Sequence, residues 1–477
     1  MRSKKTIFEG LIVSSTILLF TTLYFINAFQ YAFPIWDGAC YLENAKDLLL
    51  GLPLYEKFRP QLISFITAII WSIIGINWGV IRILSPIFFS LAIMLIYLSL
   101  RDENEVLAYL TIVFTSICPV IIEWTPHILV HALALLMVSL TYYSLIKDKW
   151  WSPYLAGLAC GLTFMARYPI VVIPASMIIF YMFVDKRYRE GILSVLIASF
   201  LISTYVMWMT SREGVFLLGL AKDVSLKITD LRFSFYYLEN GDKIWGPIFI
   251  FSIFSAFYII FRDGSRAAKL MLIWTVAPFL LWSIHPTNLN MRFTYEFAPA
   301  VVYLGLYFMF RALKKTRLAF SSKKKRFSHI IGGVLMLFTI SLTLISTAQL
   351  GVLKFHDQLT KEMWIKDENM LKVAEAVRRL PGDRIVVSSF ATMLKFFSDK
   401  DVYINWGGDG SISTLKEYVY RRVHADYLVV FLGLAANPPD QAIFSNKDLL
   451  ISAFGEPILE LEAQHVPVLF FNTSRRE

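Results

Sequence analysis

The chain has 477 residues, of which 56% are apolar and only 17% are charged. A soluble chain of this length would carry more charge and could not bury so much apolar surface, so the composition excludes an ordinary soluble enzyme. The net charge of +10 would suit a nucleic-acid partner, but the basic residues are concentrated in short loops between apolar segments, where they indicate membrane topology instead.

Eleven apolar segments have the length or pattern of membrane-spanning helices. The first, 7–29, follows three basic residues and lacks a small-residue cleavage site, so we expect an uncleaved helix. The segment 151–184 is too long for one helix and has Arg167-Tyr168-Pro169 at its middle, so two short spans should meet there. The other expected spans are 82–100, 106–122, 128–146, 191–210, 245–261, 270–284, 297–310 and 329–350.

The segment 61–76 is apolar but ambiguous, and the distribution of charge decides between its two readings. If it lies along the membrane, the loops then assigned to the cytoplasm hold 20 Lys and Arg against 7 Asp and Glu. If it spanned the membrane, the basic run 311–326 would lie outside, against the positive-inside rule. The sequence therefore predicts eleven spans, a cytoplasmic N-terminus and a multi-pass plasma-membrane protein.

Residues 351–477 have the pattern of a small folded domain. The stretch 361–380 has helical periodicity and ends at Pro381-Gly382. Short β-rich runs follow at 384–388, 402–405, 427–432 and 466–471. The predicted fold class is therefore an all-α membrane domain, residues 1–350, followed by an extracytoplasmic α/β domain, residues 351–477.

The first outer segment contains an acid at the expected boundary between lipid and water. Asp37 lies about one helical turn beyond the first span, next to Trp36. A carboxyl group in that position is partly desolvated and can serve as a base or a cation ligand. An amphipathic helix on the bilayer surface should follow, ending near Gly51. Its apolar face consists of Tyr41, Ala45, Leu48 and Leu49. A solvated acid before an ordinary interfacial helix would explain the same residues.

The order of residues in this segment resembles the protein-mannosyltransferase-like families of the GT-C glycosyltransferases. These families include dolichyl-phosphate-mannose-protein mannosyltransferases and the aminoarabinose transferases that modify lipid A. The resemblance continues through 121–136, 157–169 and 291–299 and covers about residues 10–310. The matching positions in the first segment are Asp37, Tyr41, Ala45, Leu48, Gly51, Leu54-Tyr55, Pro60, Gly75 and Arg82.

This resemblance implies a GT-C-like membrane domain and a polyprenyl-phosphate-dependent hexosyltransferase. Such an enzyme transfers a sugar from a dolichyl-phosphate type of donor to a glycan, lipid or protein acceptor at the outer face, as in protein glycosylation. The implied partners are the lipid-linked sugar, the acceptor and membrane lipid, with no nucleic acid. We expect the transfer to invert the configuration of the sugar.

The resemblance also places the first acid of the family at Asp37. A second acid often follows directly, but Gly38 occupies that position here. The family acid at the outer start of the fourth helix corresponds to His131, and the second proline of a Pro-Pro pair corresponds to Gln61. An all-acidic metal site is therefore not expected. Asp37 and His131 are the candidate ligands of a divalent metal cation.

Four arginines from separate segments are expected near the outer face, against the positive-inside trend. A polyprenyl phosphate presents its anionic group at that depth, and guanidinium groups bind phosphate through two parallel hydrogen bonds. Snorkelling, or pairing with Glu123 and Glu296, would explain each arginine singly. The candidate substrate-binding residues are Arg59, Arg82, Arg167 and Arg292, together with Tyr41, Tyr55 and His285.

Three polar residues lie between the third and fourth spans. His127 and His131 are four residues apart and would face the same way if the helix began near Pro126. Together with Asp37 and Glu123 they could form a cation site or an acid–base group. The candidate catalytic residues are therefore Asp37, Glu123 and His131. Polar residues at an ordinary helix start would give the same pattern.

Two other functions fit parts of the sequence. A transporter or channel would need polar groups within its spans or paired broken helices, and the sequence has no clear inverted repeat. A non-catalytic membrane protein that binds lipid-linked glycans would not need the second acid. The departures at Gly38 and His131 leave that alternative open.

Overall fold

The chain forms two compact units in the computed structural model. The helical unit consists of Met1–Ala32 and Lys57–Thr360, and the α/β unit consists of Phe33–Glu56 and Lys361–Glu477. The segment that carries Asp37 thus groups with the C-terminal part of the chain. The residues that the structure describes are 2–31, 34, 37–214, 234–262, 264–284, 290–320, 326–360, 367–404, 410–434, 438–463 and 466–474.

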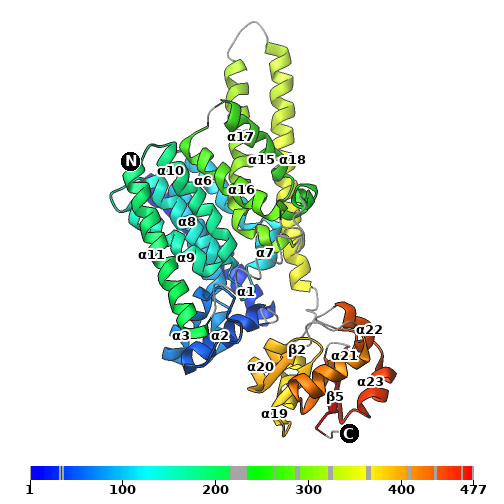
Figure 1. Ribbon diagram of the computed structural model, residues 1–477. Coiled ribbons are helices and arrows are strands. Elements are labelled where there is room, and N and C mark those ends of the chain that lie inside the picture. The colour runs from blue at the N-terminus through cyan, green and yellow to red at the C-terminus, as the bar shows by residue number, and fades with distance from the viewer. Residues whose placement is uncertain are drawn as a thin grey trace. The chain divides into compact units, whose positions relative to one another are not determined.

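Every expected span overlaps a helix of the helical unit (Figure 1). Among the described residues, five helices are long and apolar enough to cross a membrane, and the other apolar helices are shorter. The predicted mainly helical fold is thereby confirmed, whereas the count of eleven spans stays a prediction. The helices are α1 (Arg2–Tyr31), α5 (Leu84–Leu100), α6 (Glu105–Ser116), α8 (His131–Lys147), α9 (Ser152–Ala166), α10 (Val172–Phe183), α11 (Tyr188–Glu213), α15 (Ile248–Arg262), α16 (Arg266–Ile284), α17 (Ala298–Phe320) and α18 (Arg326–Thr360).

Short helices connect these long ones. The expected span 106–122 is interrupted, because Pro119 lacks an N–H and starts a separate helix. The ambiguous segment forms α3, whose 13 residues rise about 20 Å, short of a hydrocarbon core of about 30 Å. The short helices are α3 (Leu62–Ile74), α4 (Trp78–Ile81), α7 (Pro119–Trp124), η1 (Tyr168–Val171), α13 (Tyr236–Glu239), α14 (Gly241–Trp245) and η3 (Met291–Phe297).

The predicted break in 151–184 lies at Arg167. This residue ends α9 with extended backbone angles, φ −162° and ψ 104°. The 3-10 helix η1, with Pro169 in its first turn, then leads into α10. The break leaves the Arg167 side chain at a helix end instead of in the middle of a span.

Two glycines on α9 allow close packing against α11. A Cβ at Gly157 would lie 2.5 Å from the backbone oxygen of Ser194, and a Cβ at Gly161 would lie 2.9 Å from Leu201 Cβ. Glycines four residues apart form a flat strip on which a neighbouring helix can pack. Ser194 Oγ adds a hydrogen bond to Pro153 O at 2.9 Å.

The variant Gly157→Leu is expected to lower the free energy of unfolding by about 2–3 kcal/mol, since the side chain would meet a backbone oxygen that cannot rotate away. Thermal unfolding in detergent measures the loss. Gly10→Leu is the matched control, because a Cβ at Gly10 would have no atom within 4 Å. Equal unfolding temperatures for the two variants would show that α9 and α11 do not pack this closely.

The α/β unit contains a five-stranded sheet with the order β2-β1-β3-β5-β4. Strand β1 is parallel to β2 and β3, while β5 is antiparallel to β3 and β4. Buried apolar residues of the central strands, including Val386, Leu428 and Leu469, form its core. The strands are β1 (Arg384–Val387), β2 (Asp401–Ile404), β3 (Tyr427–Phe431), β4 (Leu459–Ala463) and β5 (Val466–Asn472).

The predicted strands are all present in this sheet, and β4 is an additional one. Strand β4 lies at an edge and is mostly exposed, so its sequence, with Glu460 and Glu462, lacks a continuous apolar signal. The helices of the unit are α2 (Asp37–Leu50), α19 (Asp367–Arg379), α20 (Ala391–Ser398), α21 (Ile412–Lys416), η4 (Glu417–Val423), η5 (Pro438–Asp440), α22 (Gln441–Phe444) and α23 (Lys447–Phe454).

Helix α2 differs from the expected amphipathic helix on a bilayer surface. Its polar residues Glu43, Asn44 and Asp47 are buried, so the prediction of a polar face in water is wrong. Asn44 exchanges hydrogen bonds of 2.9 and 3.0 Å with the backbone of Glu56, and Asp47 Oδ2 accepts one of 2.9 Å from Tyr55 N. These bonds fold the chain after Gly51 back onto α2.

Candidate functional site

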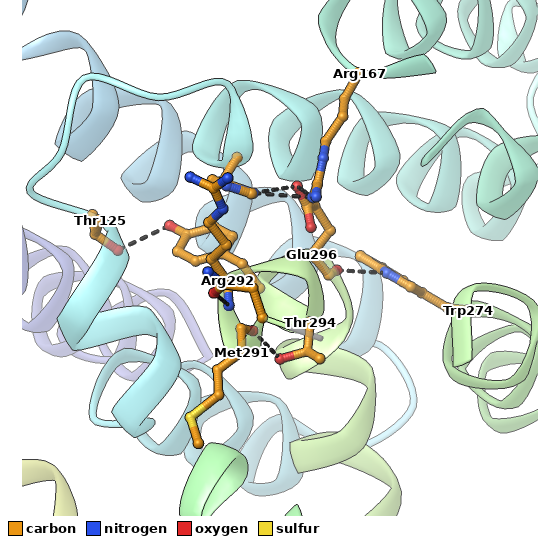
Figure 2. Close-up of polar contacts among 10 residues, drawn as sticks. Thr125, Arg167, Trp274, Met291, Arg292, Thr294 and Glu296 are labelled. Atoms are coloured by element: carbon orange, nitrogen blue, oxygen red, sulfur yellow. Dashed lines mark hydrogen bonds and ion pairs between the residues drawn. The ribbon is translucent and has the colours of Figure 1, made fainter. Parts of the chain in front are cut away.

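A buried charged cluster lies in the helical unit, formed by three residues from separate segments. Arg167 follows α9, His131 begins α8, and Glu296 lies in η3. Arg167 Nη1 donates to Glu296 Oε1 at 2.5 Å and lies 3.0 Å from His131 Nδ1 (Figure 2). His131 Nδ1 is in turn 2.9 Å from Glu296 Oε1. None of the three residues is more than 7% exposed, so these hydrogen bonds are shielded from water.

The segment η3 is held in place from several sides. Asn290 caps its first turn with its side-chain oxygen. Trp274 Nε1 donates to Glu296 O at 2.8 Å, and the hydroxyl groups of Tyr295 and Thr125 are 2.9 Å apart (Figure 2). The carboxylate of Glu296 is therefore presented from a segment whose backbone is anchored by neighbouring helices.

Two arginines share one aromatic ring in this cluster. The guanidinium carbons of Arg167 and Arg292 lie 5.1 and 5.3 Å from the centre of the Phe293 ring. Phe293 stacks on Trp282 with an interplanar angle of 9° and ring centres 4.7 Å apart. Such stacking fixes the plane of a guanidinium group without consuming its N–H donors. Arg292 also lies 5.9 Å from the ring of Trp124.

Two guanidinium groups, those of Arg167 and Arg292, lie in this cluster with the carboxylate of Glu296. Glu123 supplies a further carboxylate nearby, within electrostatic range of His127. Among the described residues, the Arg167 side chain bonds to Glu296 through Nη1, and His131 Nδ1 lies close to the same nitrogen. The Nε and Nη2 groups of Arg167 are thus the donors that an anionic ligand could engage.

The predicted pairing of His127 with His131 on one helix is wrong. Helix α8 begins only at His131, and residues 125–130 form turns and bends. His127 packs on Trp124, with ring centres 5.4 Å apart. Burial lowers the pKa of His127 to about 4; the Glu123 carboxylate opposes this effect and the Arg292 guanidinium adds to it. His127 is therefore uncharged at neutral pH, and the half-buried Glu123 lies within electrostatic range of it.

The other two predicted arginines, Arg82 and Arg59, contact other parts of the chain. Arg82 Nη1 donates to Phe29 O at 2.9 Å, and its guanidinium carbon lies 3.8 Å from the centre of the Trp78 ring. Arg59 is half-buried, and its carbonyl oxygen accepts a 3.0 Å hydrogen bond from Tyr168. Tyr168 directly follows Arg167, so the backbone of Arg59 lies close to the break after α9.

The remaining candidates belong to the α/β unit or lie outside the described residues. Asp37 is the first residue of α2 and is half-buried, and Tyr41 is buried on the same helix. The Tyr55 hydroxyl forms a hydrogen bond with the Thr392 side chain. His285 lies outside the described residues. The roles predicted for these four residues stay predictions.

The surroundings of His131 fit a divalent cation poorly. A guanidinium nitrogen lies 3.0 Å from its Nδ1, and that positive charge would repel a metal ion. Within the described ranges, no group of three or more His, Cys, Asp and Glu side chains is arranged to hold a metal ion. Metal binding by Asp37 and His131 stays a prediction.

Glu296 is the main residue whose importance the sequence did not reveal. Its only signal was an acid at the start of an apolar segment, which predicted no more than a possible partner for an arginine. In the structure Glu296 contacts both Arg167 and His131. It places a carboxylate beside His131, the position at which the family resemblance expects an acid.

Comparisons with known proteins agree with this architecture. A family model described as dolichyl-phosphate-mannose-protein mannosyltransferase matches residues 59–211. No curated protein sequence matches the chain. The structure is similar to that of ArnT from Cupriavidus metallidurans bound to undecaprenyl phosphate, with a TM-score of 0.68, 12% identity and 98% of each chain covered.

Two further solved structures share the fold. The archaeal oligosaccharyltransferase AglB from Archaeoglobus fulgidus, in complex with an inhibitory peptide and a dolichol-phosphate, gives a TM-score of 0.64 at 12% identity, covering 90% of this chain and 70% of that one. The arabinofuranosyltransferase AftD from Mycobacteria gives 0.56 at 11% identity, covering 97% of this chain and 40% of that one. Identities this low show the fold alone. With the family model, they confirm the resemblance to the GT-C glycosyltransferases.

Proposed function

We propose that this protein is a membrane glycosyltransferase that moves a sugar from a polyprenyl-phosphate donor to an acceptor at the non-cytoplasmic face of the plasma membrane, with inversion. The observation that carries the proposal is the buried cluster of Arg167, Glu296 and His131, with Arg292 on the same aromatic ring. It occurs in a fold that is shared with a protein solved with undecaprenyl phosphate bound.

The proposed topology has eleven spans, with the N-terminus in the cytoplasm and the α/β unit outside. The positive-inside rule and the overlap of each expected span with a helix support it. In this topology Arg167, His131 and Glu296 lie at outer helix ends.

The phosphate of the donor would bind at the cluster around Arg167. Glu296 neutralises Arg167 and fixes Nη1, so that Nε and Nη2 are oriented for two parallel hydrogen bonds to phosphate oxygens. Arg292, stacked on the same ring, would add a second positive charge. The polyprenyl chain would stay in the bilayer when the phosphate binds, so no free energy would be spent on moving the chain into water. Arg59 and Arg82 are further candidate contacts to the donor.

Asp37 would act as the base in the transfer step. Its carboxylate takes the proton of the acceptor hydroxyl, whose oxygen then attacks the anomeric carbon. The bond from that carbon to the phosphate oxygen breaks, and its electron pair leaves with the polyprenyl phosphate. Attack from the opposite side inverts the sugar, and the arginines stabilise the charge that develops on the phosphate. The first turn of α2 also favours a negatively charged side chain at Asp37.

Incubation of the purified protein with a panel of polyprenyl-phosphate sugars and candidate acceptors tests this function. We expect time-dependent release of free polyprenyl phosphate from at least one donor, with one sugar transferred for each lipid released. Binding of the donors without release would instead favour a non-catalytic glycan-binding protein. Solute uptake by proteoliposomes, with no release from any donor, would favour a transporter.

A further inference from the structure

We infer that the C-terminal part of the α/β unit, Lys361–Glu477, is the structural support of α2, which carries Asp37. Its positioning residues are Thr392 and Lys395 of α20 and Asp399 directly after that helix. The inference rests on the proposed function for the role of Asp37. The C-terminal residues then contribute to the transfer step by holding the base Asp37 in position. They are not a separate module that binds the acceptor.

Helix α2 packs against α20. At the first turn of α20, Thr392 Oγ1 lies 3.4 Å from Cys40 Sγ and its hydroxyl hydrogen-bonds with Tyr55. At the last turn, Lys46 forms an ion pair with Asp399. These contacts extend along the whole of the eight-residue helix α20.

The middle of this interface is formed by charged and aromatic groups. Lys395 Nζ lies 3.9 Å from Glu43 Oε1 and 5.5 Å from the centre of the Tyr55 ring. Glu43 is only 3% exposed. Burial raises the pKa of its carboxyl group to about 7, an effect that the nearby Lys46 and Lys395 ammonium groups oppose. A helix that lay loosely on a surface would keep the Glu43 carboxylate in water. Its burial therefore indicates that α2 packs closely at this interface.

Helix α20, which holds α2, is attached to a central strand of the sheet. Helix α20 follows β1, which lies between its parallel neighbours β2 and β3. The carboxyl ends of strands at such a reversal of order are where open α/β sheets commonly bind ligands. Here Ser388 Oγ bonds to Phe431 N at 2.9 Å, and Phe390 packs on Phe431 with ring centres 5.1 Å apart. Cys40 and Tyr55 contact Thr392 in the first turn of α20, which follows this end of β1.

The contacts between α2 and α20 determine where Asp37 lies within the α/β unit. Asp37 and Cys40 are three residues apart on the same helix, so their side chains lie on the same side of it. A reacting group that is misplaced by about 1 Å can lose about 100-fold in rate. Loss of the contacts to α20 should therefore lower the transfer rate without removing any group that touches the substrates.

The variant Thr392→Cys tests the docking directly, because it places a second thiol beside the native Cys40. We expect mild oxidation to form a disulfide between positions 40 and 392, detected by mass spectrometry of the linked peptides. Cys40→Ser combined with Thr392→Cys is the matched control and should give no cross-link. We also expect the cross-linked protein to retain its transfer rate within about 2-fold. Failure to form the disulfide, or an activity that is lost on oxidation and returns on reduction, would overturn the inference.

A charge exchange tests the positioning role in the uncross-linked protein. Asp399→Lys places like charges on α2 and α20, and should increase amide hydrogen exchange in α2 by about 3- to 10-fold and lower the transfer rate. Lys46→Asp combined with Asp399→Lys should restore both. Unchanged exchange and transfer in Asp399→Lys would contradict the inference. If Asp37→Asn kept full activity while the cross-link still formed, the proposed role of Asp37 would fail but the docking would stand.

Discussion

Asp37→Asn is expected to reduce sugar transfer from a polyprenyl-phosphate donor by about 1,000-fold or more, because an amide cannot take the proton of the acceptor hydroxyl. The substitution keeps the size of the side chain and its place in the first turn of α2. Folding and donor binding should therefore be preserved. Single-turnover release of polyprenyl phosphate measures the loss, and lipid binding by the same sample measures retention of the donor site.

Asp448→Asn is the matched control for this experiment. Asp448 also lies in the first turn of a helix of the α/β unit, α23, and is exposed. The control makes the same change of charge at an equivalent helix position, and we expect it to leave the rate unchanged. A rate for Asp37→Asn within a few-fold of the wild type would remove Asp37 from the mechanism.

Truncation of either partner of the buried ion pair is expected to destabilise the helical unit strongly. Arg167→Ala and Glu296→Ala should each cost about 3–5 kcal/mol, because the charge that remains is buried without compensation. The side chains are 7% and 0% exposed, so water cannot replace the missing partner. The double variant Arg167→Met with Glu296→Leu should lose much less, since neither member of the pair is then left charged without its partner. Thermal unfolding in detergent of the single and double variants measures these differences.

An exposed ion pair of the same unit provides the control. Arg187 and Asp148 are 3.0 Å apart, with side chains 47% and 26% exposed. Arg187→Ala should change the free energy of unfolding by less than about 1 kcal/mol. Similar losses for Arg167→Ala and Arg187→Ala would show that the cluster is accessible to water. The double variant Arg167→Met with Glu296→Leu also separates the role of Arg167 in stability from its role in binding the donor phosphate, because this variant should be stable but inactive.

Local features of the sequence were enough to predict most elements of the fold. Runs of apolar residues predicted the long helices, because a helix that faces lipid must be apolar over most of its length. The break at Arg167-Tyr168-Pro169 was predicted because the apolar stretch 151–184 is too long for one membrane-spanning helix. Short β-rich runs predicted four of the five strands, and the exposed edge strand β4 was missed because its alternating Glu residues resemble a loop.

Candidate site residues were predicted from depth and charge, and Glu296 was given only as one possible partner of the arginines, without saying of which one. The sequence by itself determined that this is a membrane protein with a mainly helical fold. Only the tertiary structure decided that Glu296 bonds to both Arg167 and His131, and that α2 belongs with the α/β unit. Positions 131, 167 and 296 are far apart in the chain, and Cys40 is farther still from Thr392. Helical and strand periodicity describe how neighbouring residues share a face, whereas these contacts depend on how whole elements pack.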